Sequence, residues 1–81
     1  MDFEANMLQR YRAMRDVALR QFRGNIGRAK TALDYAKIDR KHGYMAEYLE
    51  SLENVAYYRE NALWWYARYQ KKCQQIAELE K

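Results

Sequence analysis

Apolar side chains recur every three or four residues along almost the whole chain. Residues 44–79 contain neither Gly nor Pro, and one face of this segment follows the i, i+3, i+4, i+7 spacing of an amphipathic helix. That face comprises Met45, Tyr48, Leu49, Leu52, Val55, Ala56, Ala62, Leu63, Tyr66, Tyr69 and Cys73. At 1.5 Å per residue the helix would be roughly 50 Å long. The pattern predicts one long helix with these residues as its core face.

A second helical pattern covers the first half of the chain. Asp2 is suited to cap its N-terminus, and Arg40, Lys41 and His42 before Gly43 are typical of a helix end. The apolar positions at helical spacing are Phe3, Met7, Tyr11, Met14, Val17, Ala18 and Phe22, followed by Ile26, Ala29, Leu33 and Ala36. The sequence therefore predicts a second helix that ends shortly before the long one begins.

The segment Gly24–Gly27 allows two interpretations. Locally, Gly24 can end a helix and Asn25 can cap the next, which gives a three-helix bundle with helices near 2–23, 26–42 and 44–79. Globally, the apolar phase continues through both glycines, and a turn has no reason to preserve it. We favour the second interpretation, a long antiparallel hairpin with helices at about 2–41 and 44–79. In that hairpin Phe22 is expected opposite Trp64.

Composition places the chain in the all-α class. It has 81 residues, no Pro, three Gly and few β-branched residues, so we expect a single helical domain over 1–81. The core that a chain of this size can bury provides only marginal stability, so we expect the chain to form a homodimer. Cys73 is the only cysteine, no run is apolar enough to span a membrane, and the N-terminus has no signal-peptide pattern. These features predict a cytoplasmic protein.

Positive charge is concentrated in the first half of the chain. The net charge is +4, but residues 10–30 alone hold seven Lys or Arg against Asp16, a net of +6. The residues of this basic patch that we single out are Arg12, Arg15, Arg20, Arg23, Arg28 and Lys30. Arg binds phosphate and carboxylate groups through two parallel hydrogen bonds, so either chemistry is a candidate target.

The long helix carries more aromatic residues than one core face can use. Tyr57, Asn61, Trp64 and Arg68 form a stripe off the predicted core, and Tyr58 and Trp65 lie on the other flank of the helix. A helix of a two-helix hairpin buries only one stripe, and Tyr, Trp and Arg are the usual anchors of protein interfaces. The six residues are therefore a candidate protein-binding surface.

Catalytic and cofactor motifs are absent from the sequence. There is no phosphate-binding Gly-rich loop and no zinc or EF-hand spacing, and the single Ser51 and single His42 cannot form a triad. We expect no catalytic residues, no metal and no cofactor, and His42 is interpreted as a helix-end residue that complements the dipole.

Three functions remain open. The first is a small protein-interaction module that inhibits or bridges a larger protein, as many phage-encoded blockers of host machinery do. This analogy is with a general class of proteins, and no sequence motif supports it specifically. The second is RNA or DNA binding through the Arg-rich first arm. The third uses the aromatic residues only for self-assembly.

Overall fold

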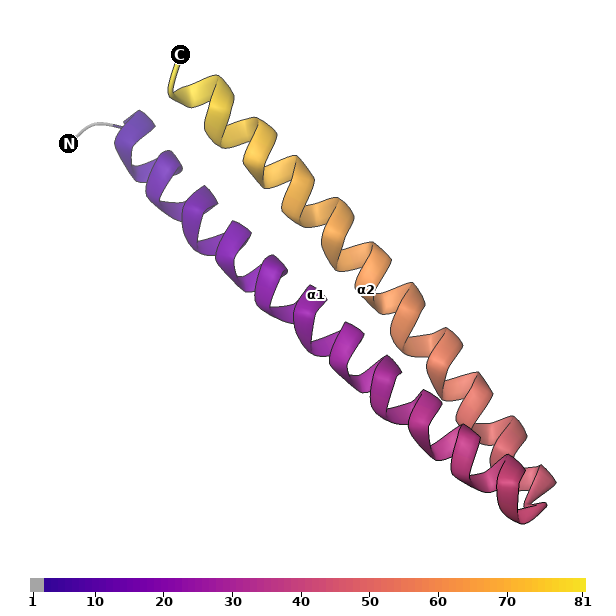
Figure 1. Cartoon of the computed structure of the whole chain (residues 1–81). Helices are drawn as coiled ribbons and strands as arrows, with labels where there is room; N and C mark the ends of the chain where they lie inside the picture. The colour runs from indigo at the N-terminus through magenta and orange to yellow at the C-terminus, as the bar shows by residue number, and fades with distance from the viewer. Residues whose placement is uncertain (1–2) are drawn as a thin grey trace.

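The computed structural model describes residues 3–81 and contains two helices joined by a tight turn. Helix α1 spans Phe3–His42, and helix α2 spans Met45–Leu79. They run antiparallel along their whole length, so the start of α1 and the end of α2 lie at the same end of the hairpin (Figure 1). The hairpin measures 62 × 14 × 14 Å. The prediction of an all-α helical hairpin is confirmed, while the start at residue 2 and the cap at Asp2 lie outside the described residues.

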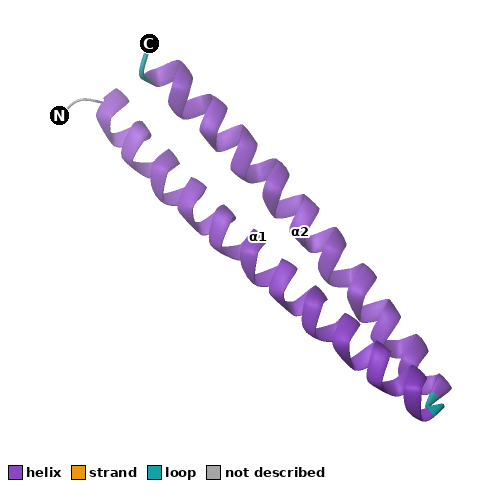
Figure 2. Ribbon diagram, in the orientation of Figure 1, coloured by secondary structure: helices purple, strands orange, loops and turns teal. Residues whose placement is uncertain are grey.

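Helix α1 continues through Gly24–Gly27 without a break (Figure 2), so the three-helix alternative is not the fold of this chain. The side chains here support the helix from within. Asn25 donates its Nδ2 hydrogen to the carbonyl of Gln21 at 2.8 Å, and Thr31 donates its hydroxyl hydrogen to the carbonyl of Gly27 at 3.1 Å. The uninterrupted apolar phase, rather than the local turn signal, decided the structure.

The turn at Gly43 ends α1 in a Schellman motif. Gly43 has a φ of +76°, the left-handed conformation that costs glycine nothing. Its N–H donates to the carbonyl of Arg40 at 3.2 Å, and the N–H of Tyr44 donates to the carbonyl of Asp39 at 2.9 Å. The predicted helix stop is therefore confirmed, and it returns the chain directly into α2.

The α1 side of the seam between the helices is built mainly from alanine, whereas the α2 side presents larger half-buried residues such as Val55, Tyr58 and Trp65. The most deeply buried side chains include Ala36 and Ala62, each only 1% exposed. The complete buried set among the described residues is Ala18, Asn25, Ala29, Ala32, Ala36, Ala62 and Ile76. Within each helix these positions are separated by three, four or multiples of seven residues, which is the 3.5-residue repeat of a coiled-coil seam. The small side chains of α1 leave room for larger side chains of α2: Ala32 lines a groove with Tyr58, and Ala18 lines one with Trp65.

The prediction of which face of the long helix is buried is wrong. Ala62 is buried and Tyr48, Val55, Tyr69 and Cys73 are half-buried, but the larger aliphatic residues lie on the surface. The exposed members are Met45, Leu49, Leu52, Leu63 and Tyr66 on α2, and Phe3, Met14, Val17 and Leu33 on α1. Two helices alone can share only a narrow stripe, and here the alanine stripe forms it. The bulkier residues are displaced to its flanks.

Contacts across the seam set the register of the hairpin. Phe22 meets Tyr66 with ring centroids 5.1 Å apart, two residues further along α2 than the expected Trp64. Ser51 donates its hydroxyl hydrogen to Asp39 at 3.3 Å near the turn. Arg12 and Glu80 form an ion pair at 2.6 Å near the open end. These contacts fix which positions of α1 and α2 lie at the same level.

Candidate protein-interaction surface

The six residues singled out as a protein-binding surface lie together along α2. We call this set the aromatic flank: Tyr57, Tyr58, Asn61, Trp64, Trp65 and Arg68. Tyr57 and Trp64 are 60% and 55% exposed, whereas Tyr58, Asn61 and Trp65 are half-buried. The flank therefore has two aromatic side chains presented to solvent and a partly buried layer beneath them.

Ring contacts hold the presented side chains in place. Tyr57 and Tyr58 meet edge to face at 5.4 Å, and Trp64 and Trp65 do so at 4.8 Å with an interplanar angle of 87°. The guanidinium carbon of Arg68 lies 4.6 Å from the Trp64 ring centroid, which is a cation–π distance. Neighbours that limit the available rotamers reduce the side-chain entropy that a binding event would cost.

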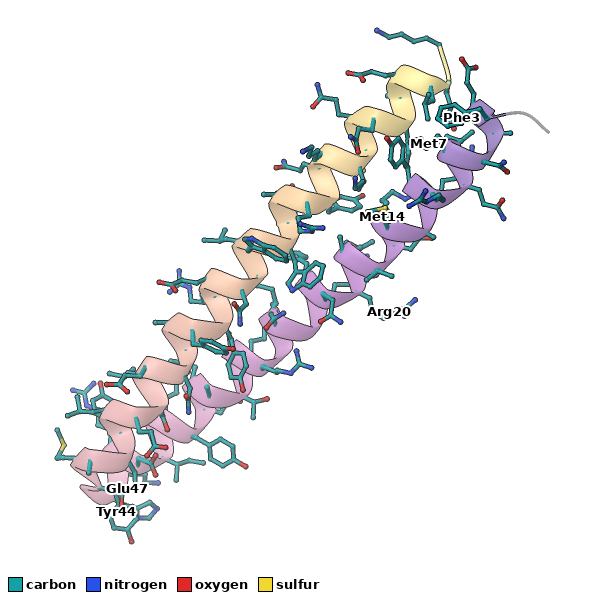
Figure 3. The ribbon with its side chains drawn as sticks, turned by 180° about the vertical axis from the view of Figure 1, so that it is seen from behind. Phe3, Met7, Met14, Arg20, Tyr44 and Glu47 are labelled. Atoms are coloured by element: carbon teal, nitrogen blue, oxygen red, sulfur yellow. The ribbon has the colours of Figure 1, made fainter. Side chains whose placement is uncertain are left out.

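Trp65 anchors the aromatic flank to α1. It lines a shallow groove together with Ala13, Met14, Val17 and Ala18 of α1, and Arg68 and Lys72 of α2 complete the lining. Figure 3 shows Met14 on α1 at the boundary with α2. The flank thus extends from α2 across the seam, and it includes apolar side chains that we had assigned to the core.

A second groove continues the same side of the hairpin toward the turn. It has a volume of about 570 Å³, and its lining includes Arg28, Thr31 and Tyr35 from α1 and Ser51, Asn54 and Tyr58 from α2. Arg28 folds back over Gly24, where a Cβ would lie only 3.4 Å from the Arg28 Nη1 atom. Gly24 thus provides room for this arginine beside the aromatic residues.

Sequence reasoning missed Tyr35, Met14 and Asn54 as neighbours of the aromatic flank. The signal was present in the alanines, because Ala18, Ala29, Ala32 and Ala36 repeat at heptad spacing. Had these alanines been taken as the seam, Met14 and Tyr35 would both fall on the flank that faces Asn54 and Arg68.

The predicted basic residues are distributed around α1. Arg12 is paired with Glu80, and Arg15 contacts Asp16 through its Nε atom at 3.1 Å. Arg28 joins the groove beside the aromatic flank. Arg20, Arg23 and Lys30 are exposed, and Arg20 extends away from α1 in Figure 3. At 100° per residue these six positions occupy several sides of the helix.

Two further polar side chains, His42 and Tyr69, interact with neighbours inside the hairpin. His42 stacks on Tyr44 at 5.7 Å, beside the turn. Within residues 3–81 no three His, Cys, Asp or Glu side chains gather closely enough to hold a metal ion. A side-chain hydrogen bond and an electrostatic interaction with Cys73 raise the pKa of Tyr69, and nearby Arg15 opposes this.

Comparison with protein-family models, curated proteins and solved structures finds no match. A function for this surface must therefore be inferred from its own chemistry. In the described part of the chain, neither helix is long and apolar enough to cross a membrane.

Proposed function

We propose that this protein is a non-catalytic interaction module that inhibits or bridges a larger protein by occupying part of its surface. The observation that carries the proposal is the pair Tyr57 and Trp64, exposed two turns apart on the same face of α2 with Arg68 against the Trp64 ring. Exposed Trp, Tyr and Arg in one patch are the residues that dominate interface energetics.

The chemistry of the flank also indicates the type of partner surface. Arg28, Arg68 and Lys72 line the two grooves beside the apolar side chains, where they outnumber the single carboxylate Glu60 next to Trp64. The ammonium group of Lys72 lies 4.8 Å from the Tyr11 ring centroid. A complementary surface would offer an apolar pocket for Trp64 with carboxylates at its rim, since opposite charges at a rim steer association. We expect an acidic protein surface as the target.

Nucleic-acid binding through α1 is the alternative. It would require basic side chains to neutralise several phosphates along one path, because phosphate neutralisation dominates affinity for nucleic acids. The basic residues of α1 are dispersed, and Arg12 and Arg15 already contact carboxylates. These observations favour the protein-binding function.

The test is affinity capture from host lysate with tagged protein, with and without nuclease and at two salt concentrations, followed by mass spectrometry. The captured protein is then purified, and its affinity is measured for wild type and for Tyr57→Ala/Trp64→Ala. We expect the double variant to lose at least about 30-fold in affinity, the equivalent of a 2 kcal/mol hot spot. Helicity by circular dichroism should be unchanged.

Tyr44→Ala is the matched control. Tyr44 is an equally exposed aromatic residue, but it lies at the tip of the hairpin, away from the aromatic flank (Figure 3). Its substitution should leave partner affinity unchanged. Equal losses in the control and the double variant would show that the aromatic flank is not the site. Recovery of nucleic acid alone, lost on nuclease or salt treatment, would favour the alternative.

A further inference from the structure

A second apolar surface lies on the other side of the hairpin from the aromatic flank. We call it the aliphatic flank: Leu33 of α1 with Met45, Leu49, Leu52, Leu63 and Tyr66 of α2. The Phe22–Tyr66 contact and the Arg12–Glu80 ion pair bridge the two helices on this side. The six side chains are 36% to 68% exposed, although most of them are aliphatic. Neither the seam nor the proposed partner site covers them.

The amount of surface left exposed is large for a single chain. The hairpin exposes 6445 Å², whereas a compact monomer of 9.9 kDa is expected to expose about 5,200 Å². Its radius of gyration is 18.2 Å, against about 12 Å expected for a compact domain of this length. At roughly 200 Å² for a fully exposed large side chain, the aliphatic flank alone presents on the order of 600 Å².

That area matches the interface of a symmetric dimer. Two such flanks in contact would bury on the order of 1,200 Å², which is at the lower end of standard stable interfaces. The largest apolar patch of a typical monomer is about 300–600 Å², so the aliphatic flank lies at the upper end of that range. Since a two-fold dimer joins the same patch on both copies, a single flank suffices to build the whole interface.

Charged residues border the aliphatic flank, mostly basic on α1 and acidic on α2; the exceptions are Asp16 in the α1 row and Arg59, which lies between Leu52 and Tyr66 on α2. Arg23, Lys30 and Lys37 recur every seven residues along the border on α1, and Glu53 and Glu60 do so on α2. All five are exposed, and the described part of the chain offers them no ion-pair partner. The register of the hairpin puts Glu60 near the level of Lys30 and Glu53 near that of Lys37.

We propose that the aliphatic flank docks a second copy of this chain, giving a four-helix bundle with both turns at the same end. In this arrangement the two-fold axis runs along the bundle, α1 of one copy lies on α2 of the other, and each basic border meets an acidic one. The opposite arrangement, with turns at opposite ends, would place α1 on α1 and bring the cations of both copies together, which is unfavourable.

The interface is tested by sedimentation equilibrium of the full chain over a range of concentrations. We expect wild type to have twice its monomer mass, and Leu63→Glu to weaken dimerisation by at least about tenfold, because a carboxylate would be buried against apolar side chains. Tyr57→Glu is the matched control, since Tyr57 is similarly exposed on the aromatic flank, and it should dimerise normally. Circular dichroism verifies that both variants remain helical.

A wild-type chain that stays monomeric at high micromolar concentration would overturn the proposal. A dimer broken by Tyr57→Glu but not by Leu63→Glu would overturn it as well, because the interface would then be the aromatic flank. Neither result depends on a foreign partner, so this experiment and the test of the proposed function can fail independently.

The arrangement of the two copies has its own test. Spin labels attached through His42→Cys, in a chain that also carries Cys73→Ala, should lie close together when both turns are at one end. With turns at opposite ends they would be separated by about the full hairpin length of 62 Å. Lys30→Glu and Glu60→Lys should each weaken the dimer, and combining them should restore it; the absence of restoration would refute the charge pairing.

Discussion

The same substitution, Gly to Ala, should have opposite effects at Gly43 and at Gly27. A Cβ added at either position meets no heavy atom within 4 Å, so packing does not distinguish the two sites. Only the backbone does: Gly43 has a φ of +76° in the turn, whereas Gly27 lies inside α1 with ordinary helical geometry. The pair therefore isolates backbone conformation from side-chain contacts.

The expected magnitudes follow from those conformations. An L-residue in the left-handed region costs about 1–2 kcal/mol, partly offset by about 0.4–1 kcal/mol of lost unfolded-state entropy. Gly43→Ala should therefore destabilise the fold by about 1 kcal/mol. Gly27→Ala should stabilise it by about 0.8–1 kcal/mol, the difference in helix propensity. The two variants should differ by roughly 2 kcal/mol.

The assay is urea denaturation followed by circular dichroism, at one fixed protein concentration because association would shift the apparent stability. Thermal midpoints should differ by about 8–16 °C for a chain of this length. Equal shifts in both variants would refute the turn at Gly43, and destabilisation by Gly27→Ala would show that α1 is not continuous there. Gly43→Asn should be milder than Gly43→Ala, since Asn tolerates the left-handed region.

Three further outcomes follow from individual contacts. Ala62→Leu should cost about 1–3 kcal/mol in urea denaturation by overpacking the seam, whereas Ala67→Leu on the exposed side of α2 should be nearly neutral. The interactions that raise the pKa of Tyr69 stabilise the fold below pH 10, and this stabilisation is lost as pH rises through the folded-state pKa. In a spectroscopic titration, Cys73→Ala should let this tyrosine ionise at lower pH. Arg12→Ala should reduce stability by about 0–1 kcal/mol, and high salt should abolish the difference from wild type, since the Arg12–Glu80 pair is half exposed.

Sequence reasoning recovered the hairpin because its strongest signals agree. The absence of Pro, the unbroken apolar phase through Gly24 and Gly27, and the cations before Gly43 all indicate two long helices and one turn. The local turn signal at Gly24 was misleading because a helix can absorb two glycines when the surrounding residues keep their phase. Here Asn25 and Thr31 also bond to the carbonyls one turn earlier.

The position of the core could not be read from hydrophobicity alone. Leu49, Leu52 and Leu63 outrank Ala62 on any hydrophobicity scale, so the leucine face was taken as buried. In a two-helix hairpin the seam is one stripe wide, and small residues at heptad spacing allow the closest backbone approach. In the structure the stripe that contains Ala62 is buried, and Leu49, Leu52 and Leu63 lie exposed beside it.

This division of the surface links the two proposals. The aliphatic flank and the aromatic flank border the same seam on different sides, so joining two copies through the first leaves Trp64 of each copy facing outward. A dimer would then present two identical partner-binding sites on one rigid rod, and simultaneous engagement would raise the apparent affinity well above that of one site. The narrow seam makes this possible, because it covers only one stripe of each helix and leaves apolar side chains exposed on both sides of that stripe.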